Sequence, residues 1–209
     1  MYDKKVNILK IIKTYDNPYF KDKSRVLGNC FIVKDKENIY HYEFIINNTT
    51  ATIISDNDIY INEVIDKFRF YNKYITKFKT KDNSFYKSFD DIFTFKLPIS
   101  VIAPSQFFIN EDKLNNLDNY MDVDEIYLPV NIINDEYILL DGHHRLYLAY
   151  INHKKMVNVY IDEFDDSIYD FVYFAKEQNI KNIKDLKVIS KELYKELWDG
   201  FCDQYFNSK

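Results

Sequence analysis

Residues 137–161, YILLDGHHRLYLAYINHKKMVNVYI, constrain the fold most, because they hold one of only three glycines in a chain of 209 residues. An apolar run ends at Asp141, the chain can turn at Gly142, and apolar residues at helical spacing follow. The segment closes on Val157, Val159 and Ile161, which alternate with other residues as in a half-buried strand. The pattern predicts a strand, a tight turn, a helix and a second strand.

The predicted turn brings His143, His144 and Arg145 to the start of a helix. The first N–H groups of a helix have no partner within it and the helix dipole is positive there, so this end stabilises an anion. Gly142 lets the backbone approach a ligand closely, and the planar guanidinium of Arg145 suits phosphate oxygens. Asp141 could hold Mg²⁺ or accept a proton. We therefore predict a phosphate-binding site at this turn.

Structural roles remain open for the same residues. Asp141 could simply cap the helix, either histidine could serve packing, and Arg145 could form a surface ion pair. The adjacent histidines are a poor zinc signal, because neighbours on a helix point in different directions and no Cys or His follows at ligand spacing. The combination of polar residues around Gly142 at one turn favours the functional interpretation.

Residues 1–84 are expected to form a small N-terminal α+β domain. Alternating and continuous apolar runs predict strands over residues 31–33, 39–46 and 50–54. Apolar residues at helical spacing predict a helix over residues 59–78. The polar residues 79–84 are expected to form a linker.

Residues 85–163 are expected to form a second α+β domain. A strand is predicted over residues 93–102, and Asn110 is expected to cap a helix whose first turn is acidic. Pro129 interrupts a strand over residues 126–133, which should therefore lie at a sheet edge or a bend. Amphipathic helices are predicted within the C-terminal part, residues 164–209, at 167–178 and 189–206.

Residues 97–163 resemble the ParB/sulfiredoxin-like superfamily. The resemblance lies in DGHHRL, the short helix after it and the VNVYI strand, and in Pro104-Ser105-Gln106 and Leu128-Pro129-Val130. It implies a mixed α+β domain in which Gly142–Arg145 bind the phosphates of a nucleotide. It also implies that Ser105 and Gln106 contact the nucleotide or its substrate.

Three branches of the superfamily differ at this loop. Sulfiredoxins carry a catalytic Cys in a GCHR motif where this chain has His143, so sulfinic acid repair lacks its thiol. Chromosome-partition ParB proteins carry a GERR-type motif followed by a helix-turn-helix domain, and residues 162–209 contain no convincing recognition helix. The DGHHR sequence is similar to that of free-serine kinases. That similarity implies phosphoryl transfer from ADP or ATP to a small hydroxylated compound, with Mg²⁺.

Catalytic roles follow from the same resemblance. Free-serine kinases use a glutamate near the start of the first helix as general base, and the matching residue here is Glu111, with Asp112 as its neighbour. Asp141 and His143 are the other catalytic candidates, and Asp141 is the candidate metal ligand. Phosphoryl transfer needs positioning, charge neutralisation and one carboxylate that orients the hydroxyl. Glu111 could equally be an acid that stabilises a helix dipole.

Composition limits the partners. The net charge of −5 and pI near 5.4 provide no global basic surface, so nucleic acid is not an expected partner. Cys30 and Cys202 have no CxxC partner, which is typical of reduced thiols in the cytoplasm. No apolar run approaches the roughly 20 residues that span a bilayer, so we expect a soluble, cytoplasmic protein.

Three functions remain open from the sequence. The leading hypothesis is a nucleotide-dependent phosphotransferase that acts on a small hydroxylated metabolite. The alternative is a non-catalytic switch in which CTP, ATP or ADP controls association with another protein or with DNA. The third is a nuclease, which would need a denser carboxylate or histidine metal cluster than the sequence shows.

Overall fold

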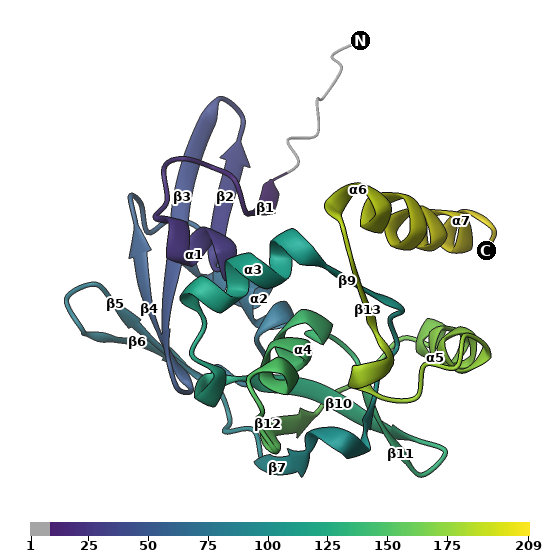
Figure 1. The fold of residues 1–209 in the computed structure, drawn as a ribbon. Helices are drawn as coiled ribbons and strands as arrows, with labels where there is room; N and C mark the ends of the chain where they lie inside the picture. Colours follow the sequence, from purple (N-terminus) through teal and green to yellow (C-terminus); the bar gives the residue numbers. More distant parts are fainter. Residues whose placement is uncertain (1–8) are drawn as a thin grey trace. The chain divides into compact units, whose positions relative to one another are not determined.

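The computed structural model describes residues 9–209 (Figure 1). The chain forms two compact units, one ending at Ile92 and one running from Phe93 to Lys209. Each unit has its own β-sheet and helices, so the fold class is mixed α+β, as the sequence predicts. Within residues 9–209, no helix combines the length and the apolar character that crossing a bilayer requires.

The N-terminal unit is built on a six-stranded sheet of order β1-β2-β3-β4-β5-β6. Its strands are β1 (Lys10–Thr14), β2 (Cys30–Asp35), β3 (Asn38–Asn47), β4 (Thr50–Ser55), β5 (Lys77–Thr80) and β6 (Phe85–Ser88), and its helices are α1 (Asp22–Val26) and α2 (Ile61–Tyr71). Neighbouring strands are antiparallel except β4 and β5, which run parallel and are connected through α2. Buried Phe44 and Phe68 stack with ring centroids 4.0 Å apart, so α2 packs on the sheet through aromatic rings.

Two predictions for this unit are wrong. The helix predicted over residues 59–78 ends at Tyr71, and Phe78 lies in β5. Phe68 from the helix and Phe78 from the strand are both fully buried. The sequence pattern of buried apolar residues therefore continues past Tyr71, although the helix ends there. Residues 79–84 are not a linker, because they include the turn between β5 and β6, in which Asn83 adopts a φ of 68°.

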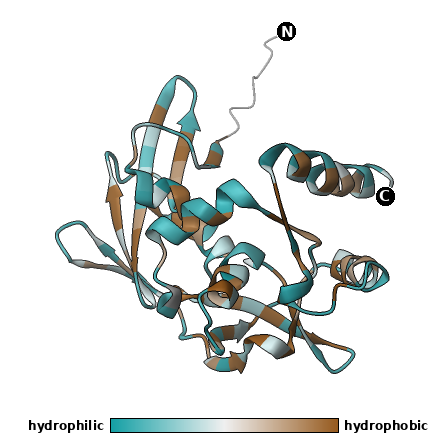
Figure 2. Cartoon of the chain, in the orientation of Figure 1, coloured by the Kyte–Doolittle hydropathy of each residue, from teal (hydrophilic) through white to brown (hydrophobic). Residues whose placement is uncertain are grey.

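The C-terminal unit is built on a five-stranded mixed sheet of order β7-β12-β10-β11-β8. Its strands are β7 (Thr94–Pro98), β8 (Ile102–Ala103), β10 (Tyr127–Ile133), β11 (Glu136–Leu139) and β12 (Met156–Ile161). A parallel pair, β9 (Phe108–Asn110) and β13 (Lys187–Ile189), forms a second, small sheet. Apolar residues concentrate on these strands, as the brown segments of Figure 2 show.

Helices of this unit share its core with the sheet. They are α3 (Glu111–Tyr120), α4 (His143–Ile151), α5 (Ser167–Glu177), α6 (Lys191–Tyr194) and α7 (Gly200–Asn207), with a π-helical turn, Lys195–Asp199, between the last two. The helix predicted from residue 189 begins later, because Ile189 ends β13 and the Ser190 side chain accepts a hydrogen bond from the Leu193 N–H as a cap. Leu146, Leu148 and Ala149 are fully buried, which fixes α4 in the core.

Pro129 lies in a central strand and not at the predicted edge or bend, because β10 has neighbours on both sides. In an antiparallel pair the N–H and C=O of one residue point to the same side. The Pro129 carbonyl accepts a hydrogen bond of 3.0 Å from the N–H of Leu140, the residue after β11 ends. The missing N–H of proline therefore faces the end of the ladder, where it removes little of the β10–β11 pairing.

Candidate functional site

A strand, a tight turn and a helix meet at Gly142. The strand β11 ends at Leu139, and Gly142 precedes the first residue of α4 with a φ of 87° and a ψ of 29°. This left-handed conformation is one that glycine adopts at little cost. Among residues 9–209, no side chain caps the N-terminus of α4, so the amides of its first turn can receive an anion.

The guanidinium of Arg145 lies directly against this turn. A β-carbon placed on Gly142 would come within 2.8 Å of Nε and Nη2 of Arg145 and of Leu128 Cδ2. Nη1 of Arg145 donates to the Tyr127 carbonyl at 3.2 Å, and Nη2 donates to Oδ2 of Asp141 at 3.3 Å. The Arg145 side chain is only 16% exposed, whereas that of Asp141 is 67% exposed. The structure thus places a fixed positive charge beside the amides of α4.

His143 is held by the segment that precedes β9. Its Nε2 accepts a hydrogen bond of 3.0 Å from the backbone N–H of Ser105, and the Ser105 hydroxyl donates to the Leu139 carbonyl at 2.8 Å. All three residues are buried. This network joins the predicted Ser105 contact to the predicted phosphate loop across 38 residues of sequence.

His144 is held in the same way by the start of α3. Its Nε2 accepts a hydrogen bond of 2.9 Å from the backbone N–H of Asn110. The Asn110 side chain in turn accepts from the Lys113 N–H at 2.9 Å and caps α3, as the sequence predicts. Glu111 is the first residue of α3 and is exposed, so the candidate base follows directly on a residue that contacts the loop.

Both imidazoles are neutral at pH 7. Burial, with a smaller effect of the Arg145 charge, lowers the pKa of His143 to about 4, although Asp141 opposes this. Burial, helped by Lys113, lowers the pKa of His144 to about 3. Because Nε2 of each ring accepts an N–H, the single proton of each neutral ring must sit on Nδ1. Each ring is therefore fixed as an Nδ1–H donor.

Gln106 is connected to His144 through Tyr194. Its Nε2 donates to the Phe108 carbonyl, and its side chain is also hydrogen-bonded to Tyr194. Tyr194, from α6, packs edge-on against His144 with ring centroids 5.8 Å apart. The structure thus bonds Ser105 to the turn at Gly142, links Gln106 to His144 through Tyr194, and places Glu111 next to Asn110.

Sequence reasoning missed two residues of this site. Lys113 places its Nζ 5.1 Å from the Tyr194 ring centroid, and its charge acts on His144. A basic residue in the first turn of a helix interacts unfavourably with the helix dipole. This unfavourable position of Lys113 could have marked it as a candidate site residue from the sequence. Tyr194 gave no local signal, because its burial depends on how α6 folds back onto the loop.

The metal prediction concerns Asp141 alone. Within the described residues, no group of three or more His, Cys, Asp or Glu side chains is arranged to hold a metal ion. Mg²⁺ is commonly held by one or two carboxylates together with substrate phosphates and water. The exposed Asp141 carboxylate, next to the turn at Gly142, fits that kind of site.

Two solved structures share a low level of similarity with this chain. No family model and no curated protein matches the chain. Protein Atu1540 from Agrobacterium tumefaciens is 15% identical over 46% of this chain and 62% of that protein, with a TM-score of 0.34. The C-terminally truncated chromosome-partitioning protein ParB from Caulobacter crescentus, complexed with CTP-gamma-S, is 19% identical over 42% of this chain and 53% of that protein, with a TM-score of 0.31. The match covers less than two thirds of either structure.

Proposed function

We propose that the protein binds the phosphates of ADP or ATP at the N-terminus of α4 and transfers a phosphoryl group to a small hydroxylated metabolite. The observation that carries this proposal is the Arg145 guanidinium, which lies against Gly142 beside the uncapped amides of α4. A helix N-terminus, a glycine that admits close approach and a planar cation together match a phosphate group.

The two histidines supply further donors in this proposal. Neither His143 nor His144 forms a hydrogen bond through Nδ1 within residues 9–209. A neutral imidazole with its proton on Nδ1 donates one hydrogen bond and adds no charge. We assign these two Nδ1–H groups to phosphate oxygens, with the backbone of Ser105 and Asn110 fixing the rings.

Asp141 has the metal role in this proposal. Its carboxylate is exposed and also accepts from Arg145, so it would hold Mg²⁺ together with phosphate oxygens. Bound Mg²⁺ neutralises charge that develops on the phosphates. The Nη2–Oδ2 hydrogen bond of 3.3 Å holds this carboxylate beside the Arg145 guanidinium.

Glu111 is the general base of the proposed reaction. It accepts the proton of the acceptor hydroxyl, whose oxygen attacks the terminal phosphorus as the P–O bond to the nucleotide breaks. The products are the phosphorylated metabolite and a nucleotide shorter by one phosphate. The exposed position of Glu111 at the start of α3, next to Asn110, leaves its carboxylate open to such an acceptor.

A binding and turnover experiment tests both parts of the proposal. Thermal unfolding is followed with ADP, ATP and CTP, each with and without Mg²⁺, and a nucleotide present at 100 times its Kd should stabilise the folded state by about 2.7 kcal/mol. Nucleotide consumption is then measured with a panel of small alcohols, including hydroxylated amino acids. Equal insensitivity of the melting temperature to every nucleotide overturns the proposed binding site.

The Glu111→Gln variant separates chemistry from binding. We expect it to abolish turnover while nucleotide affinity stays nearly unchanged, since the amide retains shape but cannot take a proton. Asp112→Asn is the matched control, because Asp112 is an equally exposed acid one position along α3. Equal loss of turnover in both variants would contradict the assignment of the base.

The second candidate is a nucleotide-binding switch without chemistry. The contact between His144 and Tyr194 favours it, because that contact links the loop to the C-terminal helices. A switch would bind nucleotide, change its oligomeric state or partner affinity, and consume no nucleotide with any acceptor. Size-exclusion chromatography with and without nucleotide distinguishes the two functions.

A further inference from the structure

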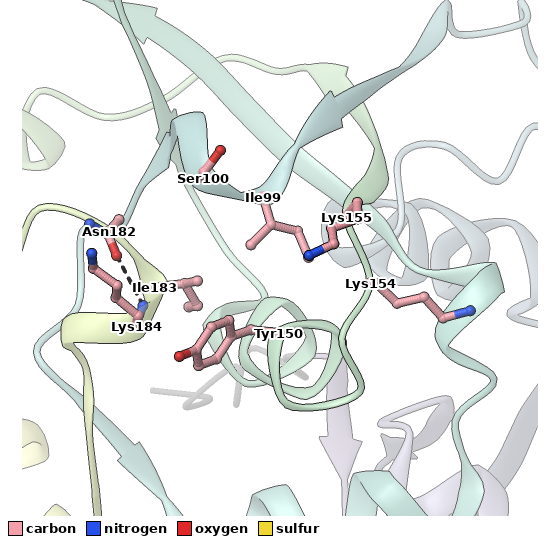
Figure 3. A pocket seen from close by; sticks show the side chains of 8 residues that line it. All are labelled: Ile99, Ser100, Tyr150, Lys154, Lys155, Asn182, Ile183 and Lys184. Atoms are coloured by element: carbon pink, nitrogen blue, oxygen red, sulfur yellow. Dashed lines mark hydrogen bonds between the residues drawn. The ribbon is translucent and has the colours of Figure 1, made fainter.

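A cavity of about 280 Å³ lies at the C-terminal end of α4 (Figure 3). The last turn of α4 contributes Tyr150, and the turn that follows contributes Lys155. The 3-10 turn η1 (Ile99–Val101) and the 3-10 turn η3 (Ile183–Asp185) form the other walls. Tyr150 follows Gly142 by eight residues, about 12 Å along a helix, so this cavity is separate from the proposed phosphate site.

The cavity carries unneutralised positive charge. Three lysines line it and no acidic residue does. Nζ of Lys154 pairs with Asp124 at 2.5 Å, and Figure 3 shows that side chain extending away from the others. Among residues 9–209, Lys155 and Lys184 form no ion pair. In a chain with a net charge of −5, two unpaired lysines beside one cavity favour an anionic ligand.

The lysines are not explained by the C-terminal end of α4. Cations near a helix C-terminus usually interact with its last carbonyls. Here the carbonyls of Leu148, Ala149 and Tyr150 already accept N–H groups of residues 152–154. Lys184 comes from a different element, η3. Both amines therefore remain available to a ligand.

The rest of the lining is apolar or donates hydrogen bonds. Ile99 and Ile183, 5% and 2% exposed, form its apolar part, and the ring of Tyr150 adds an aromatic wall (Figure 3). The Asn182 side-chain oxygen already accepts the Lys184 N–H at 3.2 Å, which leaves its amide nitrogen as a donor. A buried apolar part with a rim of donors matches a ligand that has an apolar body and an anionic end.

We propose that this cavity binds a small organic anion, a carboxylate or a phosphate monoester on an apolar body of about one ring. The volume lies just below the usual range of ligand pockets, roughly 300–1,000 Å³, which limits the body to that size. Lys155 and Lys184 hold the anionic group, and Ile99, Ile183 and Tyr150 contact the body. This inference does not depend on the proposed function of the loop.

Titration of the isotopically labelled full chain by NMR tests the site. The probes are phenyl phosphate, benzoate, inorganic phosphate and the neutral benzyl alcohol. We expect phenyl phosphate or benzoate to shift the amide signals of Lys155, Asn182 and Lys184. The probe that binds with the higher affinity identifies the anionic group. We expect inorganic phosphate and benzyl alcohol each to bind about tenfold more weakly, because each lacks one half of the ligand.

Variants assign the two charges. Lys155→Gln and Lys184→Gln should each lower the affinity for the tighter-binding probe by about tenfold, the usual effect of one charge-assisted hydrogen bond. Lys187→Gln is the matched control, since Lys187 is an exposed lysine outside the cavity lining. The amide spectra also report whether each variant is folded. Absence of shifts at these amides with every anion, or equal affinity for benzyl alcohol and phenyl phosphate, overturns the proposal.

Discussion

The backbone N–H of Asn110 donates a hydrogen bond of 2.9 Å to Nε2 of His144 and joins the start of α3 to the start of α4. Ser105 makes the equivalent bond to His143 at 3.0 Å. Both bonds need an unprotonated Nε2, because a protonated ring would turn a donor toward a donor. The geometry of the loop therefore depends on two histidines that stay neutral.

Stability should fall as the pH is lowered through the ordinary range of histidine. The folded-state pKa values, about 4 for His143 and about 3 for His144, lie below the ordinary histidine pKa of 6.5. The unfolded chain then binds more protons than the folded one below pH 6.5, so the stabilisation is present above pH 6.5 and is lost as the pH falls. As the pH falls from 7.5 to 5, each ring should lower the free energy of unfolding by about 2 kcal/mol.

Urea unfolding at several pH values measures this loss. The chain has one tryptophan, Trp198, which packs against Phe107 with ring centroids 5.0 Å apart, so its fluorescence reports on the C-terminal unit. His144→Gln should reduce the pH dependence by about half, since the amide oxygen can accept the Asn110 N–H without titrating. The exposed His153 provides the control variant His153→Asn, which should keep the full slope because Asn tolerates the φ of 58° there. A pH-independent free energy of unfolding contradicts the assigned tautomers.

The Gly142→Ala variant should damage both the fold and the proposed phosphate site. Alanine at a φ of 87° is strained by about 1–2 kcal/mol, and its β-carbon would lie 2.8 Å from Nε of Arg145. The guanidinium must then move from the amides of α4. We expect a loss of about 2 kcal/mol in stability and at least about a tenfold loss in ATP affinity by calorimetry.

Gly200→Ala is the matched control for that glycine. Gly200 has helical dihedrals, and the nearest atom to an added β-carbon is the Lys195 carbonyl oxygen at 3.8 Å. The same substitution should stabilise the protein by about 0.5–1 kcal/mol, since alanine is the better helix former. Unchanged ATP affinity in both alanine variants would contradict the placement of the ligand at Gly142.

The Arg145→Lys variant tests shape against charge. A lysine keeps the positive charge, but its single amine cannot reproduce the planar fork that bonds Tyr127 and Asp141 together. We expect about a tenfold loss of nucleotide affinity by calorimetry. Arg25→Lys replaces a similarly bonded guanidinium of the N-terminal unit and should leave the affinity unchanged. Wild-type affinity in Arg145→Lys would reduce the role of this side chain to its charge alone.

Features with local causes could be predicted from the sequence. The turn at Gly142 follows from a rare glycine between an apolar strand and a helical pattern, and the Asn110 cap follows from its place before an acidic first turn. Pro129 shows the limit, because its residue type alone favours an edge. Its actual place in β10 is tolerated only because β11 ends opposite it.

Features with non-local causes could not be predicted. The sequence predicts His143 and His144 as donors at the loop, but it gives no sign of their Nε2 partners, which come from 38 and 34 residues away. Which ring nitrogen carries the proton is decided by those partners and by burial. The predicted helix over residues 59–78 is too long for the same reason. Phe78 reaches the core from β5, a strand that forms only by pairing with its neighbours β4 and β6.

The Lys113→Gln variant tests whether the proposed site uses a second cation. Lys113 is exposed on the first turn of α3, and its charge contributes to the low pKa of His144. A phosphate near the His144 ring would therefore also attract the Lys113 amine. Because this amine is open to solvent, we expect the variant to lose about 1 kcal/mol of ATP binding, close to fivefold, with the loss shrinking as salt is added. Lys113→Arg keeps the charge and should bind ATP as the wild type does. Equal affinity of the Gln and Arg variants at low salt would place the bound phosphates away from α3.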